Sequence, residues 1–252
     1  MEERIRKRKI VLVGTGFVGM SFAYSLLSEK GINELVLIDM NKDKAVGEQM
    51  DLSDGLPYAD SKMTIKAGEY EECGDADIVV ITAGAAQKPG QTRLELVGIN
   101  ARITKDVATQ VKNSGFKGIL VVASNPVDIM TYVAYKASGL PKEHVIGSGT
   151  ILDTARLRYN ISKRLGMAPS NVHAYILGEH GDSSFVPWIH CYLGCKNLLE
   201  YIDEEDNLTL EDLQNIYLEV RNAAYEIIDR KKATYYGIGL ALKRLVSCLL
   251  ND

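Results

Sequence analysis

The chain has 252 residues, of which 46% are hydrophobic and 25% charged, as is usual for a globular protein of one large or two modest domains. Its formal net charge of −4 argues against a nucleic-acid partner, because the 29 Lys and Arg residues are scattered along the chain. The four cysteines form no CxxC pair and lack partners at metal-ligand spacing, so we expect reduced thiols, no metal site and a cytoplasmic protein.

A basic run, RIRKRK, precedes the apolar IVLVG near the N-terminus, as at the start of a secretory signal. Glycines at positions 14, 16 and 19 interrupt this apolar run, and no stretch of the sequence is apolar for the length that a membrane-spanning helix needs. We therefore expect a short basic extension and no membrane partner.

Short runs rich in Val and Ile alternate with longer amphipathic stretches through the first half of the chain. We expect strands over 9–14, 34–39, 76–84, 118–126 and 144–149, and helices over 17–30, 41–53, 94–114 and 127–138. This alternation predicts an α/β fold with a doubly wound parallel sheet, the Rossmann arrangement, over residues 1–149.

The pattern changes after Gly149. The sequence then predicts a helix over 151–165, a strand over 172–178, a solvated acidic run at 203–206 and helical segments within 208–250. This mixture predicts a second, α+β domain over 150–252.

A glycine-rich turn, Gly14-Thr-Gly16-Phe-Val-Gly19, lies between the first expected strand and the first expected helix. Such glycines allow a tight turn, the approach of a pyrophosphate and close packing of helix on strand. Asp39 ends the next strand, where a carboxylate accepts ribose hydroxyls and repels a 2′-phosphate, which favours NAD over NADP. The alternative is a plain turn with Asp39 as a helix N-cap. The expected cofactor-binding set is Gly14, Gly16, Phe17, Val18, Gly19, Asp39, Thr82, Ala83, Gly84 and Asn125.

Four further stretches carry residues suited to hydride and proton transfer: AAQKPGQTR (85–93), SNP (124–126), LDTARLR (152–158) and GEHGD (178–182). His180 is the candidate acid/base, because imidazole exchanges protons near neutral pH. Asp153 could fix its tautomer, and Arg156, on the same helical face, could hold a carboxylate with two hydrogen bonds. Arg93 could polarise a substrate carbonyl.

In identity and order, these motifs and KKATYYGIG resemble those of the 2-hydroxy-acid dehydrogenases of the lactate/malate dehydrogenase family, over essentially the whole chain. The resemblance implies that His180 is the proton donor and acceptor, with Asp153 as its partner. It implies that Arg156 anchors the substrate carboxylate and that Arg93 acts from a loop. It further makes Asn125 a hydrogen bonder to substrate and Thr234 a residue of the substrate pocket.

Gln87 bears on the choice of substrate. The malate branch of the family places an arginine here to pair the second carboxylate of oxaloacetate, and a neutral Gln would leave that carboxylate buried without a counter-ion. The expected reaction is therefore NAD-dependent interconversion of pyruvate and L-lactate. The alternatives are another 2-hydroxy acid such as malate, a catalytically impaired NAD-binding fragment, or a structural interaction module.

Arg158 and His173 suggest a second site. Bacterial lactate dehydrogenases activated by fructose 1,6-bisphosphate have an Arg and a His at the matching positions, between paired subunits, which implies an allosteric homotetramer. The alternative is a surface salt bridge and an ordinary strand histidine. Family members usually continue beyond the helix that ends near Asn251, so we expect this chain to lack their C-terminal segment.

Overall fold

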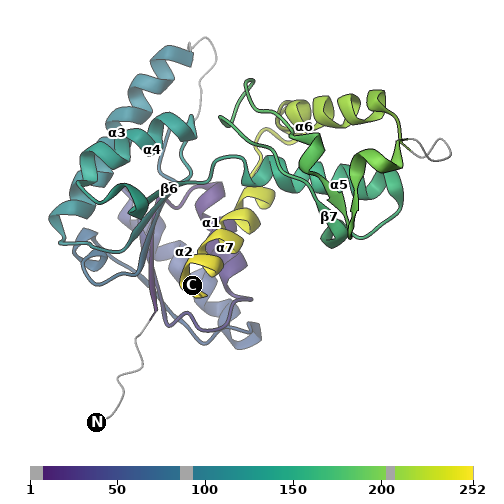
Figure 1. Cartoon of the computed structure of the whole chain (residues 1–252). Coiled ribbons are helices and arrows are strands. Elements are labelled where there is room, and N and C mark those ends of the chain that lie inside the picture. The colour runs from purple at the N-terminus through teal and green to yellow at the C-terminus, as the bar shows by residue number, and fades with distance from the viewer. Residues whose placement is uncertain (1–7, 86–92, 203–207, 252) are drawn as a thin grey trace. The chain divides into compact units, whose positions relative to one another are not determined.

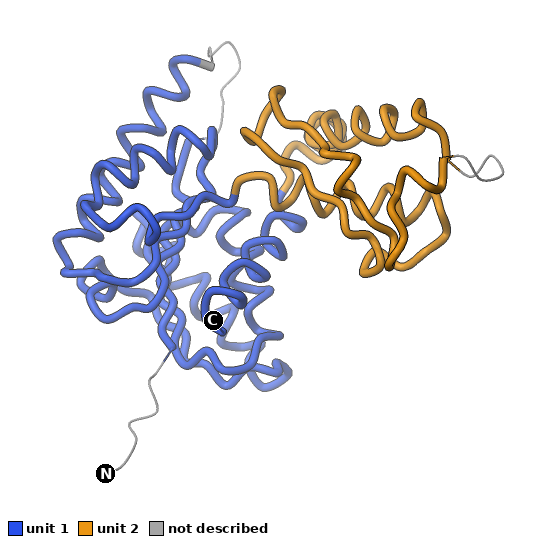
Figure 2. Tube along the Cα trace, viewed as in Figure 1, with its two compact units in different colours: residues 1–148, 235–252 blue, residues 149–234 orange. Residues whose placement is uncertain are grey.

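The computed structural model describes residues 8–85, 93–202 and 208–251 (Figure 1). Contacts divide the chain into two compact units, coloured separately in Figure 2. Unit 1 comprises Met1–Ser148 together with Tyr235–Asp252, and unit 2 comprises Gly149–Thr234. The first change of unit falls beside the expected boundary at residue 149, whereas the last segment of the chain packs in unit 1 rather than in the expected second domain.

Unit 1 is built on a six-stranded sheet whose pairings are all parallel, in the order β3-β2-β1-β4-β5-β6. The strands are β1 (Lys9–Val13), β2 (Glu34–Ile38), β3 (Thr64–Ala67), β4 (Ile78–Ile81), β5 (Ile119–Val122) and β6 (Val145–Gly147). The expected doubly wound sheet is thereby confirmed. Strand β3 was not expected from the sequence, because TIKA is a short edge strand with an exposed first residue and a lysine.

Helices cover both faces of this sheet (Figure 1). One face carries α1 (Phe17–Leu26), α2 (Lys42–Gly55) and α7 (Tyr236–Asn251), and the other carries α3 (Arg93–Asn113) and α4 (Val127–Ser138). Because side chains alternate along a strand, Ile10 and Leu12 of β1 pack under α1 and α7, whereas Val11 and Val13 pack under α3 and α4. Each such fully buried aliphatic side chain contributes about 1.5–3 kcal/mol, which explains the almost unbroken apolar strands.

Helix α7 joins unit 1 by packing along α1. Its buried residues Leu242 and Val246 belong to the same core cluster as Phe22 and Leu26 of α1. Close approach depends on Gly239, where a Cβ would lie 2.8 Å from the backbone carbon of Ser21. These contacts explain why the segment after residue 234 is part of unit 1.

Among the described residues of unit 1, one charged side chain is buried. Lys9, at the start of β1, keeps 7% of its side chain exposed and lies 2.6 Å from Glu72, 2.5 Å from Asp75 and 3.5 Å from Glu34. Burial by itself lowers the pKa of Lys9, but hydrogen bonds to Asp75 and Glu72 outweigh it and raise the pKa above its usual range. The ammonium group thus joins β1, β2 and the turn before β4 at the amino end of the sheet.

Unit 2 contains two long helices, α5 (Ile151–Leu165) and α6 (Leu210–Lys231), and a three-stranded antiparallel sheet. Its strands β7 (Val172–His173), β8 (Tyr192–Leu193) and β9 (Lys196–Asn197) have two residues each, so the expected strand over 172–178 is mostly irregular backbone with one bridge at Leu177. A capping box of Thr209 and Asp212 begins α6.

Short 3-10 helices make several of the connections: η1 (Leu56–Tyr58), η2 (Tyr70–Cys73), η3 (Lys142–His144), η4 (Pro169–Asn171), η5 (Trp188–His190) and η6 (Leu198–Tyr201). Within the described ranges, no helix is both long and apolar enough to span a membrane.

Candidate active site and cofactor site

The glycine turn lies between β1 and α1, and each glycine has a separate structural reason. Gly14 has φ 106°, and a Cβ there would be 2.6 Å from the Ala83 nitrogen. A Cβ on Gly19 would be 2.1 Å from the Gly14 carbonyl oxygen, so this position requires glycine for packing. A Cβ on Gly16 would meet no protein atom within 4 Å. Gly16 is therefore not needed for packing, which fits a position that a pyrophosphate approaches.

Asp39 follows β2 and holds the same turn. Its Oδ2 accepts hydrogen bonds from the Thr15 backbone N–H (2.8 Å) and hydroxyl (2.9 Å), and its Oδ1 accepts one from the Asn41 N–H (3.0 Å). Burial alone would raise the pKa of Asp39, but these donors, with Lys44 nearby, hold it below the usual value. A carboxylate accepts about four hydrogen bonds, so Oδ1 keeps capacity for a ribose hydroxyl.

The structure excludes the alternative role of Asp39 as a helix cap. Asn41 caps α2, and its side chain accepts a hydrogen bond from the Lys44 N–H. Lys44, which the sequence did not single out, donates through its ammonium group to the Thr15 carbonyl. The glycine turn therefore has a fixed anion and a fixed cation beside it.

Side chains join the carboxyl ends of β1, β4 and β5. The Thr82 hydroxyl donates to the Gly14 carbonyl (2.7 Å), and the Ser124 hydroxyl donates to the Ala83 carbonyl (2.5 Å). Gly84 and Asn125 follow directly in the chain. The structure thus brings the expected cofactor residues after β4 and β5 next to the glycine turn, at the sheet edge where α/β proteins bind nucleotides.

Two members of the expected cofactor set extend from the first turn of α1. Phe17 is 72% exposed and stacks on Tyr235, with ring centroids 5.1 Å apart. Val18 is partly buried against the core formed by α1 and α7. The Phe17 ring therefore contacts Tyr235, the residue that precedes α7.

In unit 2, His180 and Asp153 are brought together as the sequence predicted. His180 Nδ1 lies 2.6 Å from Asp153 Oδ2, although the residues are 27 positions apart. The Asp153 side chain is 12% exposed and that of His180 is 31% exposed, so the pair is sheltered while the ring retains access to solvent. Because a carboxylate can only accept a hydrogen bond, Nδ1 carries a proton, and Nε2 is the nitrogen left to exchange a proton with a ligand.

Arg156 binds the other oxygen of the same carboxylate. Its Nη1 lies 3.3 Å from Asp153 Oδ1, one turn along α5. Burial lowers the pKa of Arg156, and the charge of Asp153 partly offsets this change, but a guanidinium remains charged at neutral pH. Asp153 therefore orients a histidine with one oxygen and an arginine with the other.

Two threonines that the sequence did not single out fix the His180 segment on α5. The Thr150 hydroxyl donates to the Ile176 carbonyl (2.6 Å), and the Ile176 N–H donates to the Thr154 hydroxyl (3.0 Å). Both backbone groups of Ile176, four residues before His180, are thus bonded to the helix that carries Asp153. Threonine is common in helices and caps, so only the tertiary contact reveals this function.

Arg158 on α5 is half-buried in unit 2 and lies beside the segment that follows β7. Arg158 Nε donates to the Ala174 carbonyl (3.0 Å), and its guanidinium lies 4.6 Å from the Tyr175 ring centroid. His173 is exposed on β7. Arg158 is therefore held by Ala174 and Tyr175, the two residues that follow β7.

The remaining predicted residues can be placed only in part. Thr234 is half-buried in the connection between α6 and α7. Arg93 begins α3, while its side chain, like all of Gln87, lies outside the described residues. Across the described ranges, no cluster of three or more His, Cys, Asp or Glu side chains could hold a metal ion.

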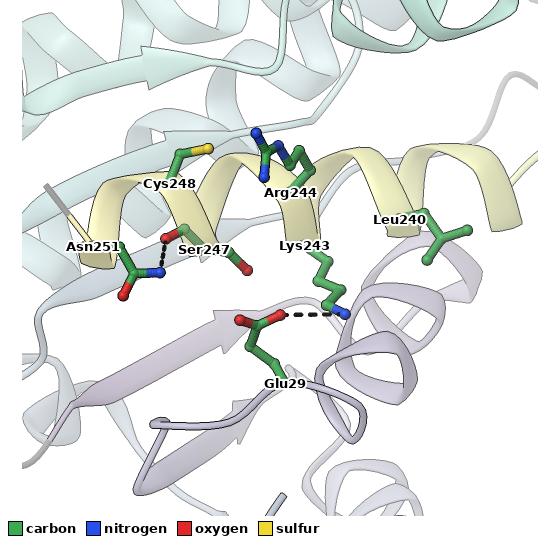
Figure 3. Close-up of a pocket in the computed structure, with 7 residues that line it drawn as sticks. All are labelled: Glu29, Leu240, Lys243, Arg244, Ser247, Cys248 and Asn251. Atoms are coloured by element: carbon green, nitrogen blue, oxygen red, sulfur yellow. Dashed lines mark hydrogen bonds and ion pairs between the residues drawn. The ribbon is translucent and has the colours of Figure 1, made fainter. Parts of the chain in front are cut away.

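A separate polar pocket of about 450 Å³ lies along α7 (Figure 3). Lys243 forms an ion pair with Glu29 at 3.2 Å within it, and Arg244 and Cys248 project from the same helix. Asn251, at its far end, accepts a hydrogen bond from Arg8, which precedes β1. The pocket therefore lies toward the amino end of the sheet and contains none of the predicted site residues.

Comparison with known families agrees with this arrangement. Residues 8–147 match the NAD binding domain of lactate/malate dehydrogenases, and residues 150–252 match their alpha/beta C-terminal domain. The chain is 53% identical over 249 residues to an L-lactate dehydrogenase of Lactococcus lactis subsp. cremoris, covering 99% of this chain and 79% of that protein. It is 51% identical to L-lactate dehydrogenase 1 of Bacillus cereus, covering 97% and 78%.

Solved structures give the same result. A lactate dehydrogenase from a Medee basin deep-sea metagenome library superposes with a TM-score of 0.95 at 57% identity, covering 98% of this chain and 79% of that one. The minor L-lactate dehydrogenase of Enterococcus mundtii, in its ligands-bound form, gives 0.93 at 53% identity, covering 96% and 77%. This chain belongs to the lactate/malate dehydrogenase family.

Proposed function

We propose that the chain is an NAD-dependent L-lactate dehydrogenase that interconverts pyruvate and L-lactate, with His180 as the proton donor and acceptor. The observation that carries the proposal is the 2.6 Å contact between His180 Nδ1 and Asp153 Oδ2, with Arg156 on the second oxygen. A reduced nicotinamide, when bound, supplies the hydride. The glycine turn and Asp39 are the residues that would hold its dinucleotide.

The proton chemistry follows from the partners of His180. With Nδ1–H directed at Asp153, Nε2 gives its proton to the carbonyl oxygen of pyruvate as that oxygen becomes a hydroxyl, and takes it back in the reverse direction. The Asp153 carboxylate stabilises the imidazolium form that must be present before reduction. The two steps balance, since one hydride and one proton are added to the carbonyl group.

Arg156 provides the anchor for the substrate carboxylate in this proposal. Its partial burial weakens competition from water, and a planar guanidinium offers two parallel N–H donors. Arg93 would polarise the carbonyl, while Asn125 and Thr234 would contact the substrate through hydrogen bonds. These roles for Arg93, Asn125 and Thr234 rest on the sequence resemblance.

The direct test is oxidation of NADH by pyruvate and by oxaloacetate, with equilibrium NADH binding measured in parallel. Turnover of pyruvate that His180→Gln abolishes while NADH still binds is the expected result. Binding without turnover would favour the impaired fragment, and absence of NADH binding would favour the interaction module.

Gln87 is proposed to select pyruvate. Gln87→Arg would supply a counter-ion for a second substrate carboxylate, so the ratio of kcat/KM for oxaloacetate to that for pyruvate should rise by at least about tenfold. An unchanged ratio would contradict the assignment of Gln87.

A second proposal is that Arg158 and His173 bind fructose 1,6-bisphosphate as an activator. Arg158 supports it, because its stacking on Tyr175 and its Nε bond to Ala174 orient the guanidinium and leave its terminal nitrogens to bind phosphate. The activator should lower the KM for pyruvate in the unaltered chain but not in Arg158→Gln. Fructose 6-phosphate serves as the control ligand, and equal responses of both chains would refute the site.

We further propose a cytoplasmic homotetramer. Supporting features are four free thiols and an apolar groove of about 840 Å³ on unit 1, between α1, η1 and the start of α7. Tyr24, Tyr58 and Tyr236 line it and are 71%, 96% and 68% exposed, and aromatic patches of this kind mark protein interfaces. Sedimentation velocity should show a species near four chain masses, and a monomer would refute the assembly.

A further inference from the structure

Asn100 is a buried amide with every hydrogen-bonding group satisfied by backbone. It lies on α3, about two turns after Arg93, and is 3% exposed. Its Oδ1 accepts from the Ala85 N–H at 2.8 Å, and its Nδ2 donates to the Asn125 carbonyl at 2.8 Å and to the Ala85 carbonyl at 3.4 Å. One side chain therefore bonds to the residues that follow both β4 and β5.

These bonds begin where the sheet stops. The register of β4 and β5 ends at Ile81 and Val122, with one further backbone bond from the Ala123 N–H to the Ile81 carbonyl. Beyond it the two chain segments are joined by side chains, first Ser124 to Ala83 and then Asn100 to Ala85 and Asn125. Beyond the strand ends, the Asn100 amide thus links the same two chain segments that backbone hydrogen bonds link within the sheet.

We infer that Asn100 is a positioning residue for the proposed reaction: it fixes the Asn125 backbone and so aims the Asn125 side chain. The inference rests on the proposed function, in which Asn125 contacts substrate. Only an amide of this length supplies an acceptor for Ala85 together with donors for two carbonyl groups. A displacement of about 1 Å at a substrate-contacting group is enough to cost on the order of a hundredfold in rate.

The sharpest variant is Asn100→Asp, which keeps the size of the side chain and the acceptor for the Ala85 N–H but replaces both N–H donors with an oxygen. That oxygen would face the carbonyls of Ala85 and Asn125. A suitable control is Thr104→Val, one turn further along α3, where the wholly buried Thr104 hydroxyl donates to Met130 Sδ at 3.3 Å. Both variants remove buried hydrogen bonds from the same helix, but only the first touches Asn125.

For Asn100→Asp, kcat/KM for pyruvate should fall about 10- to 100-fold. The dissociation constant of NADH should change much less than kcat/KM, because Asn100 bonds to only one member of the expected cofactor set, Asn125, whereas the glycine turn and Asp39 are held by other bonds. Thr104→Val should lower the melting temperature yet keep kcat/KM within about twofold of the unaltered chain. Assays are run well below the lower of the two melting temperatures.

Three results would overturn the inference. One is an Asn100→Asp protein with undiminished kcat/KM, and another is an equal loss in Thr104→Val, which would mean that the effect is general destabilisation. The third is an unaltered chain that turns over no pyruvate, which removes the proposed function and the inference with it. The unaltered chain assayed alongside distinguishes this last failure from the first two.

Discussion

The two units hold their polar side chains in different ways. In unit 1, a parallel sheet with long apolar strands fixes the backbone, and the predicted cofactor residues lie just past the strand ends. In unit 2, strands of two residues fix little, and the segment that carries His180 is bonded to Asp153 and Thr154 of α5 and to Thr150 just before that helix. A regular sheet can position many backbone atoms at one edge, whereas in unit 2 polar side-chain bonds to α5 position a single imidazole ring.

The largest expected effect separates the tasks of the two units. Asp153→Asn removes the carboxylate that selects the His180 tautomer, so kcat should fall about 10³- to 10⁴-fold, as for the equivalent carboxylate of a serine-protease triad. NADH affinity, assigned to unit 1, should stay within about twofold, as measured by fluorescence titration. Asp229→Asn, an exposed carboxylate on α6, is the control, and a parallel loss of NADH binding would contradict the division of tasks.

The next effect concerns the stability of unit 1. Lys9→Met removes the cation from between Glu34, Glu72 and Asp75, and loss of one partner from a buried ion pair costs about 3–5 kcal/mol. Urea unfolding followed by circular dichroism measures the loss. Lys42→Met, which breaks the exposed pair with Glu69, should leave the midpoint unchanged within error. Equal urea midpoints for the two variants would show that the buried Lys9 cluster stabilises the fold no more than an exposed ion pair does.

A smaller effect concerns the glycine turn, where one glycine is expected to matter for stability and another for NADH binding. Gly19→Ala places a Cβ against the Gly14 carbonyl oxygen and should lower the free energy of unfolding by about 2 kcal/mol. Gly16→Ala meets no protein atom, so stability should be retained while NADH binding weakens by about tenfold or more. Thermal unfolding and NADH titration of both variants check this contrast. Tight NADH binding by Gly16→Ala would remove Gly16 from the cofactor site.

The smallest effect depends on pH. Because the folded-state pKa of Asp39 is lowered, its ionised form stabilises the fold above the unfolded-state value of 3.8, and this contribution is lost as pH falls through the folded-state pKa. Asp39→Asn should therefore be less stable than the unaltered chain at about pH 7, with a narrower gap at about pH 3.5. Urea unfolding at both pH values measures the gap, with exposed Asp51→Asn as control. A gap that widens in acid would contradict the sign of the shift.

Sequence patterns predicted the parts of the molecule that burial dictates. The apolar runs predicted five of the six strands of the large sheet, and the chemistry of His180 and Asp153 predicted that their side chains would meet. Strand β3 was missed because an edge strand needs few apolar residues. The place of α7 in unit 1 was missed because an amphipathic helix shows that it packs, but not against what.

The supporting polar contacts were not visible in the sequence. Asn100, Thr154 and Lys44 lie within helices and Thr150 lies just before one, and each acts through a bond to backbone. Asn100 and Asn125 are 25 positions apart, a separation for which no periodicity exists. Such contacts follow only from the folded arrangement, whereas motifs indicate which residues are candidates for the chemistry.

The return of α7 to α1 has a consequence for synthesis of the protein on the ribosome. Phe22 and Leu26 are made early, yet their cluster includes Leu242 and Val246, which leave the ribosome after all of unit 2. Closing contacts across so long a stretch of chain slows folding, because loop entropy is lost before the contacts compensate for it. During translation, the apolar side of α1 therefore stays exposed until α7 emerges. Exposed apolar surface is what chaperones bind, so we expect chaperone binding to unit 1 during that interval.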